Sequence, residues 1–146
     1  MQTLEQVTEK VQRILMENYP IRRDKDGDIH INHESAHLYV RVRERTFNEN
    51  QKDFIVQLFC PLINSFEPTQ EVFKWVAIEG QSYFFGHIQM RMPEDGYPEL
   101  LFVHTLLADD LDESELLNAV GAVLYTSADL DTELHQKFGG QMFGKD

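Results

Sequence analysis

The chain has 146 residues, about the size of one domain, and could bury a hydrophobic core without disulfides or metal. Its formal net charge of −12 argues against a nucleic-acid surface, and its single cysteine excludes a disulfide framework within one chain. The first residues lack the features of a signal peptide, and no apolar run approaches the roughly 20 residues of a membrane span. We therefore expect one domain over residues 1–146 of a cytoplasmic protein, with no membrane or nucleic-acid partner.

The negative charge is unevenly placed along the chain. Residues 1–50 hold 8 Lys and Arg against 9 Asp and Glu, whereas residues 51–146 hold 5 against 16. No Lys or Arg lies between Arg91 and Lys137. The acidic residues could keep the protein soluble and stabilise the first turns of helices, or they could steer a basic partner towards the protein.

The longest apolar stripe lies near the end of the chain, at residues 112–138, where apolar side chains recur at three- and four-residue steps. Asp112 and Glu115 form a capping-box pattern at its start. Gly139-Gly140 supplies the stop, because glycine readily takes the left-handed conformation that ends helices. We expect one long amphipathic helix lying across a wide apolar surface.

Two shorter helices are predicted earlier in the chain. Residues 3–18 carry an apolar stripe, begin with a Thr-x-x-Gln capping box and end before Pro20. Residues 69–79 follow a proline-containing helix entry. The side chains that this second helix is expected to bury are Val72, Phe73 and Val76.

The segments between the helices predict strands. Alternation of apolar and polar residues is typical of a half-buried strand, and apolar residues on both faces of residues 54–62 indicate a central one. The expected strands are residues 29–32, 38–43, 54–62, 83–92 and 99–107. The resulting order, α-β-β-β-α-β-β-α, predicts an α+β domain with a mainly antiparallel five-stranded sheet, packed by the N-terminal and long C-terminal helices.

Possible metal and catalytic motifs do not meet the demands of their chemistry. Asp24–Asp28 resembles a calcium loop, but the register set by its glycine puts Arg22 and His33 at ligand positions, so we interpret it as a turn. His30, His33 and His37 could approach one another on a hairpin, yet a metal needs three or four converging ligands. Cys60 lies in an apolar run and is expected to be inert. We predict no catalytic residue, metal or cofactor.

One face of the predicted sheet has the composition of a recognition surface. If Leu38, Val40 and Val42 face the helices, with Phe84 and Ile88 on the same side, the opposite face mixes aromatic rings with arginines. The candidate partner-binding residues are Tyr39, Arg41, Arg43, Ile55, Phe59, Tyr83, Phe85, His87 and Arg91. Phe102 and His104 could also lie on this face. Their strand is apolar on both faces, so the sequence does not decide which way they point. The second helix or a second subunit could also cover this face.

Several short segments resemble the YbjN-like family, whose members have a type III secretion chaperone-like fold. The segments that carry the resemblance are Glu71–Val76, Phe84–Met90, Asp95–Gly96, Ala108–Leu116 and Ala128–Asp129. The resemblance implies an acidic non-enzymatic protein, often dimeric, that holds a partner polypeptide in extended or partly folded form. It implies no catalytic or metal residues, and a link to secretion does not follow from it.

The sequence is therefore compatible with two functions. The first is a peptide- or protein-binding chaperone-like or regulatory module, with the ligand on the aromatic and basic face or in a groove beside the first helix. The second is a small-molecule-sensing regulatory domain, with a pocket between the sheet and the long helix. Aromatic residues exposed on a sheet face also predict a homodimer.

Overall fold

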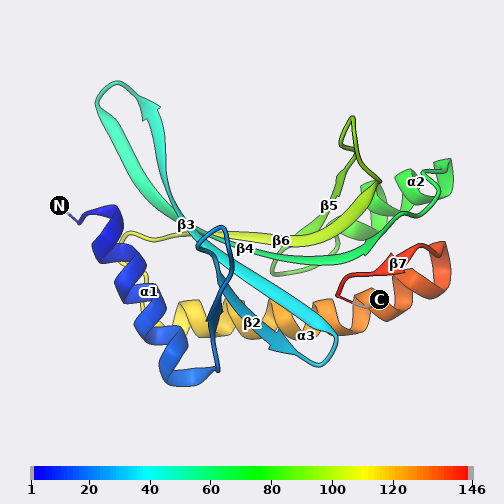
Figure 1. Cartoon of the computed structure of the whole chain (residues 1–146). Helices are drawn as coiled ribbons and strands as arrows, with labels where there is room; N and C mark the ends of the chain where they lie inside the picture. The colour runs from blue at the N-terminus through cyan, green and yellow to red at the C-terminus, as the bar shows by residue number, and fades with distance from the viewer. Residues whose placement is uncertain (1, 145–146) are drawn as a thin grey trace.

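A single twisted sheet runs through the molecule, and the helices pack against one of its faces (Figure 1). The structure, a computed structural model, describes residues 2–144. In chain order the elements are α1 (Leu4–Asn18), β1 (Arg22–Arg23), β2 (Ile29–His33), β3 (Ala36–Asn48), β4 (Gln51–Asn64), α2 (Gln70–Ile78), the 3-10 turn η1 (Glu79–Gln81), β5 (His87–Arg91), β6 (Glu99–Leu107), α3 (Glu113–Phe138) and β7 (Gln141–Met142).

The strands lie in the order β1-β2-β3-β4-β6-β5, and every neighbouring pair is antiparallel. The short strand β7 lies off this path and pairs with the end of β4. Strands β3 and β4 form a long hairpin whose tip extends beyond the rest of the sheet (Figure 1). The α+β class and the mainly antiparallel sheet expected from the sequence are confirmed.

Helix α3 runs across the sheet and supplies the largest share of the helical core (Figure 1). The Asp112 side chain accepts a hydrogen bond from the Glu115 backbone N–H at its start, and Gly139 follows its last residue with a φ of 76°. Both ends therefore lie where the local signals predicted them. The buried apolar residues along α3 are Leu116, Ala119, Val120, Val123, Leu124, Ala128, Leu130 and Leu134.

The other two helices pack on the same side of the sheet as α3. Helix α1 begins with a complete capping box between Thr3 and Gln6, and buries Val7, Val11, Ile14 and Leu15. In α2, the Trp75 ring packs edge-on against Phe138 of α3, with centroids 6.0 Å apart. Gly80, just after α2, lies so close to Ile88 of β5 that a Cβ there would overlap the Ile88 side chain. The second helix therefore leaves the opposite face of the sheet uncovered.

The structure differs from the expected elements at several points. The sheet has seven strands rather than five, because the two-residue strands β1 and β7 each add to it. The strand expected at residues 83–92 begins only at His87, and Phe84 is wholly exposed rather than facing the helices. Phe73 of α2 is also exposed, at 39%, whereas Trp75 packs against the core in its place.

We predict that Leu124→Ala lowers the free energy of unfolding by about 2–5 kcal/mol, because it opens a cavity under the sheet where Leu124 is 2% exposed. Urea denaturation would measure the loss. Leu4→Ala is the matched control, since it removes the same atoms from a side chain that is 40% exposed at the start of α1. Equal destabilisation by the two substitutions would contradict the placement of the core.

Candidate functional site

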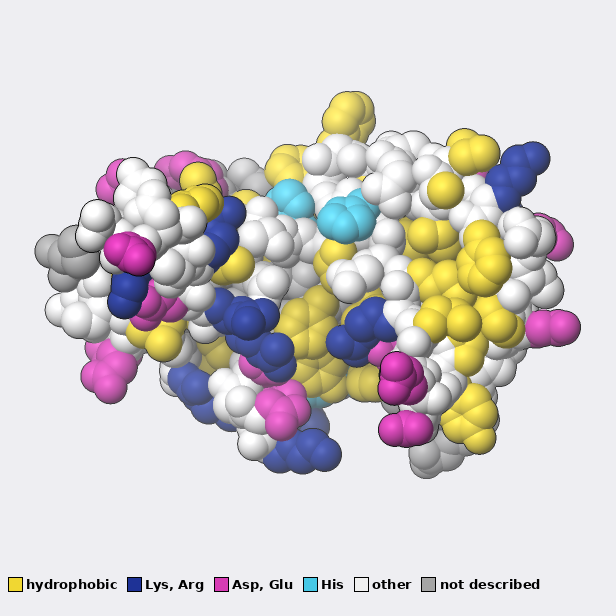
Figure 2. Space-filling view, turned by 90° about the horizontal axis from the view of Figure 1, so that it is seen from above, with side chains coloured by type: hydrophobic (Ala, Val, Ile, Leu, Met, Phe, Trp, Pro, Cys, Tyr) yellow, Lys and Arg dark blue, Asp and Glu magenta, His cyan; other side chains and the backbone are white. Residues whose placement is uncertain are grey.

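The face of the sheet opposite the helices carries a row of side chains that crosses six strands. The strand register aligns one residue from each strand: Arg22, His30, Tyr39, Phe59, Val103 and His87. Directly paired residues in antiparallel strands project from the same face. We call this surface the open face. Figure 2 shows it from above, with apolar side chains in the middle and Lys and Arg beside them.

Three rings of this row stack against one another from strand to strand. His30 and Tyr39 are almost parallel, with centroids 4.6 Å apart and an interplanar angle of 2°. Tyr39 and Phe59 follow at 5.5 Å and 18°. The three rings form a continuous aromatic strip across β2, β3 and β4, and each remains partly exposed. Such rings offer large, rigid contact areas at low entropic cost.

Arginines border the strip along β3, and they differ in how they are paired. Arg41 lies over the Phe59 ring at 5.4 Å and donates two hydrogen bonds, of 2.8 and 2.6 Å, to the buried carboxylate of Asp28. This pairing raises the pKa of Arg41. Arg43 has no carboxylate partner among residues 2–144 and reaches only the Gln57 amide oxygen, at 3.4 Å. Among the arginines of β3, Arg43 is therefore the one best placed to bind an external carboxylate.

Two histidines meet at one end of the strip. His30 Nε2 and His37 Nδ1 lie 3.1 Å apart, so the N–H of one ring donates a hydrogen bond to the ring nitrogen of the other. Burial lowers the pKa of both imidazoles, and for His30 the charge of His37 lowers it further. Within residues 2–144, no group of three or more potential ligands could hold a metal ion. The hairpin thus brings these histidines together, as the sequence allowed, as a neutral hydrogen-bonded pair.

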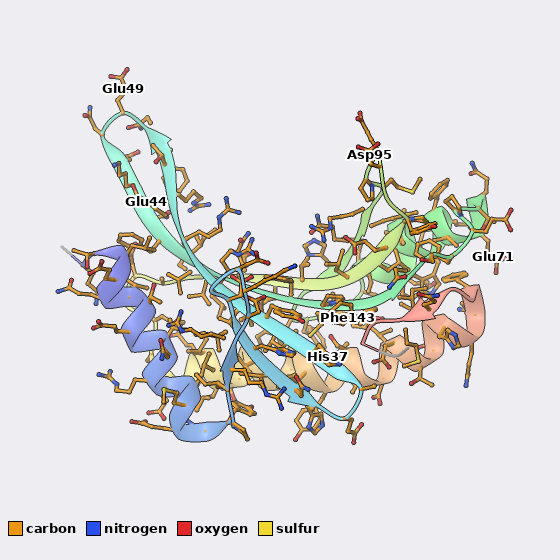
Figure 3. The ribbon with its side chains drawn as sticks, in the orientation of Figure 1. His37, Glu44, Glu49, Glu71, Asp95 and Phe143 are labelled. Carbon is orange, nitrogen blue, oxygen red and sulfur yellow. The ribbon has the colours of Figure 1, made fainter. Side chains whose placement is uncertain are left out.

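The end of the chain covers part of the same face. The Phe143 ring packs edge-on against His37, with centroids 5.3 Å apart, and against Tyr39 at 6.1 Å (Figure 3). The backbone N–H of Phe143 donates to the Leu62 carbonyl at 3.0 Å. The sequence analysis missed this contact, because a two-residue strand after a helix stop gives no periodic signal.

Most of the expected site residues lie together on the open face. Seven have the register or contacts of that face: Tyr39, Arg41, Arg43, Ile55, Phe59, His87 and Arg91. The placement of Tyr83 is wrong, because its ring packs against the fully buried Phe102 at 5.2 Å, on the helix side of the sheet. Phe85 precedes β5 instead of lying in it, and its ring packs against His104.

The register of β6 decides which of its residues reach the open face. Phe102 pairs with Cys60, and His104 with Leu58, so both lie on the helix side. The residues of β6 that lie on the open face are Leu101, Val103, Thr105 and Leu107. Leu101 is buried yet lies outside the main core cluster, which is consistent with its place on this second face. The open face is consequently more aliphatic along β6 than along β3 and β4.

The long strand β3 also has an edge without a strand partner. It pairs with β2 only as far as Val40, so that residues 41–48 pair with β4 alone. A hollow of about 240 Å³ lies beside the first of these residues and is lined by α1, by the β1–β2 turn and by Arg41 and Val42. An unpaired edge presents main-chain N–H and C=O groups to any extended chain.

The single cysteine of the chain lies on the other side of the sheet. Cys60 is fully buried on the helix side, and burial raises the pKa of its thiol to about 12. The thiol is therefore protonated at neutral pH and lacks the thiolate that nucleophilic chemistry needs.

These features define an α+β protein built on one antiparallel sheet, with its helices packed on a single face. The chain belongs to the family TY-Chap1, described as "T3SS (YopN, CesT) and YbjN peptide-binding chaperone 1", whose model matches residues 2–146. The expected family and fold are thereby confirmed. The family is one of peptide-binding chaperones.

Two solved structures are similar to this chain. The crystal structure of YbjN from E. coli is similar with a TM-score of 0.67, over 90% of this chain and 93% of YbjN, at 9% identity. SycH, a type III secretion chaperone of Yersinia pestis crystallised with a stable fragment of YscM2, gives 0.49 over 88% of this chain and 99% of SycH, at 12% identity. Curated protein sequences give no match. None of the helices among residues 2–144 is long and apolar enough to cross a membrane.

Acidification is expected to destabilise the chain through the histidine pair. The folded-state pKa values of His30 and His37 lie below the ordinary 6.5, so as the pH falls through 6.5 the unfolded chain takes up protons first. The free energy of unfolding should therefore fall between about pH 7.5 and about pH 5.5. Urea denaturation at both values would measure the drop, which His37→Asn should reduce. His135→Gln, at an exposed position of α3, is the control. An equal drop in wild type and His37→Asn would contradict the prediction.

Proposed function

We propose that this protein is a non-enzymatic, peptide-binding chaperone-like module that holds a partner polypeptide on the open face. Residues 1–146 act together as one binding domain. The observation that carries the proposal is the strip of stacked rings, His30, Tyr39 and Phe59, which is bordered by arginines and covered by no helix. Membership of a peptide-binding chaperone family supports it.

The chemistry of the open face indicates what kind of segment it would bind. Apolar side chains of the partner would pack on the ring strip and on the aliphatic residues of β6, where aromatic and aliphatic contact supplies most of the affinity. A carboxylate of the partner would pair with Arg43, which has no acidic partner of its own among the described residues. We therefore expect an extended segment in which apolar and acidic residues are interspersed.

Main-chain pairing along β3 would add to these contacts. Residues 41–48 of β3 have one edge free of strand pairing, and an extended peptide could add there as a further strand. The hollow beside α1 lies at the start of this edge and would receive a side chain from the end of the peptide. Main-chain pairing would supply affinity that depends little on the sequence of the peptide, while side-chain contacts with the open face would supply selectivity.

Binding of a small molecule is the alternative function. A ligand site of that kind is a concave pocket that encloses most of the ligand. Three hollows on residues 2–144 lie on one surface of α1, at the β3–β4 tip and beside the β3 edge, and all three are outside the space between the sheet and α3. This distribution favours a polypeptide ligand over a small molecule.

The double substitution Arg43→Glu/Ile55→Glu should abolish polypeptide capture. These residues pair directly across β3 and β4 on the open face. Glu in place of Arg43 would repel a carboxylate of the partner, and Glu in place of Ile55 would put a charge where an apolar side chain of the partner packs. We expect recovery of crosslinked polypeptides from the native host to fall at least about tenfold, as for loss of a binding hot spot. Mass spectrometry of the crosslinked pull-down would measure it.

The control for this experiment is Lys74→Glu, which reverses a charge at an exposed position of α2, on the other side of the sheet. Circular dichroism would verify that both variants fold. Recovery of the same polypeptides by wild type and by the double variant would refute the proposed site. Recovery of no polypeptide but the protein itself would refute the proposed function.

We further propose that the protein forms a homodimer through exposed apolar residues of the sheet. Leu107 is 59% exposed at the end of β6, on the open face beside Ile55. Sedimentation velocity at tens of micromolar should give a dimer, and Leu107→Glu should shift it towards monomer because a charge would be buried in the interface. Glu113→Gln, an exposed change at the start of α3, should leave the dimer intact. A wild-type monomer at that concentration would exclude this use of the face.

A further inference from the structure

The C-terminal segment occupies a short edge of β4 that β3 leaves free. Pairing of β3 with β4 begins at Tyr39 and Phe59, and β7 pairs with β4 farther along, at Ile63↔Met142 and Asn64↔Gln141. Met142 packs against the main core, whereas Phe143 lies on the His37 and Tyr39 rings. We call the residues that receive this segment, His37, Tyr39 and Leu62–Asn64, the tail seat.

A small set of contacts holds the segment in the tail seat. Two residue pairs join β7 to β4, Phe143 donates one further backbone hydrogen bond, and the packed side chains of Met142 and Phe143 are both only partly buried. Two glycines with positive φ, Gly139 at 76° and Gly140 at 75°, join the seated segment to α3. Glycine takes such angles at no steric cost and leaves the connection flexible. Docking and release of the segment therefore need no change in α3.

The tail seat adjoins the ring strip of the open face. Tyr39 belongs to both, since it stacks on Phe59 and also contacts Phe143. An extended chain lying on the strip could continue into the tail seat only by displacing Phe143. The seat thus accepts a defined chemistry: an apolar residue directed into the core, followed by an aromatic residue directed onto the His37 and Tyr39 rings.

We infer that the tail seat is a binding subsite for an extended partner segment with an adjacent apolar and aromatic residue, and that the protein's own C-terminal segment is its internal competitor. The inference rests on the proposed function, because it names part of the same site. The segment is tethered by two glycines, so its effective concentration at the seat is on the order of millimolar. A partner must outcompete it, and free protein is protected from weak, non-specific ligands.

A peptide added in trans tests this competition directly. The probe is a fluorescein-labelled synthetic peptide, Gly-Gly-Gln-Met-Phe-Gly, with the sequence of residues 139–144, and binding to the full-length protein is measured by fluorescence anisotropy. Phe143→Ala should bind the peptide at least about tenfold more tightly than wild type, because it weakens the tethered competitor. The same peptide with Ala in place of Phe should bind neither the wild-type protein nor the Phe143→Ala variant.

A reversible lock provides the second arm. Asn64 and Gln141 are directly paired across β4 and β7, and such pairs lie within the Cα separation that a disulfide requires. Oxidised Asn64→Cys/Gln141→Cys should not bind the peptide, and reduction should restore wild-type binding in the same sample. Gly140→Ala offers another way to empty the seat, since its Cβ would overlap the Asn64 carbonyl oxygen.

The matched control is Phe84→Ala, which removes the same ring from a wholly exposed position outside the seat and should bind the peptide as wild type does. Equal peptide affinity for wild type, Phe143→Ala and the oxidised lock would overturn the inference, as would no binding to folded Phe143→Ala or Gly140→Ala at millimolar peptide. Capture of host polypeptides that is equal in the oxidised and reduced lock would overturn it and leave the proposed function standing. Binding of the peptide as expected, together with no capture of any host polypeptide, would overturn the proposed function and leave the tail seat standing as a binding site.

Discussion

The constraint on which the rest of the structure depends is the packing of α3 against the middle of the sheet. Its apolar stripe buries Leu116, Leu124 and Leu134 almost completely, on the side where Val56, Leu58 and Cys60 of β4 are also buried. Helices α1 and α2 pack on that same side. Because the helices all cover one side, the other face is stabilised mainly by its own side chains. Ring stacking and the pairing of Arg41 with the buried Asp28 carboxylate do this on the open face.

Features fixed by neighbouring residues could be predicted from the sequence. The start of α1 follows from a Thr-x-x-Gln capping box, and both ends of α3 follow from Asp112 and Gly139. Tyr39 and Arg41 could be assigned to the open face because β3 alternates strictly, so that the burial of Leu38 and Val40 decides the direction of their neighbours.

Features fixed by distant residues could not be predicted. Strand β6 is apolar on both faces, so only its pairing with β4 reveals that Phe102 and His104 face the helices. The sequence pattern predicts that β5 includes Tyr83 and Phe85. However, Gly86 has a φ of 90°, at a position where a Cβ would overlap Phe102, and the strand begins only after it. The seating of Phe143 depends on residues about 80 and about 100 positions earlier, which no local pattern connects to it.

The tip of the β3–β4 hairpin has a different physical basis from the rest of the sheet. Beyond Ile55, β4 has no second strand beside it, and the described side chains at the tip are joined by ion pairs between Arg45 and Asp53 and between Lys52 and Glu44. Exposed pairs of this kind contribute little and are screened by salt. The hairpin arm is therefore held mainly by the main-chain pairing of β3 with β4, which continues to Asn48 and Gln51. Its shape can be kept while the charges along it change, so the arm can differ in charge without a change in the rest of the sheet.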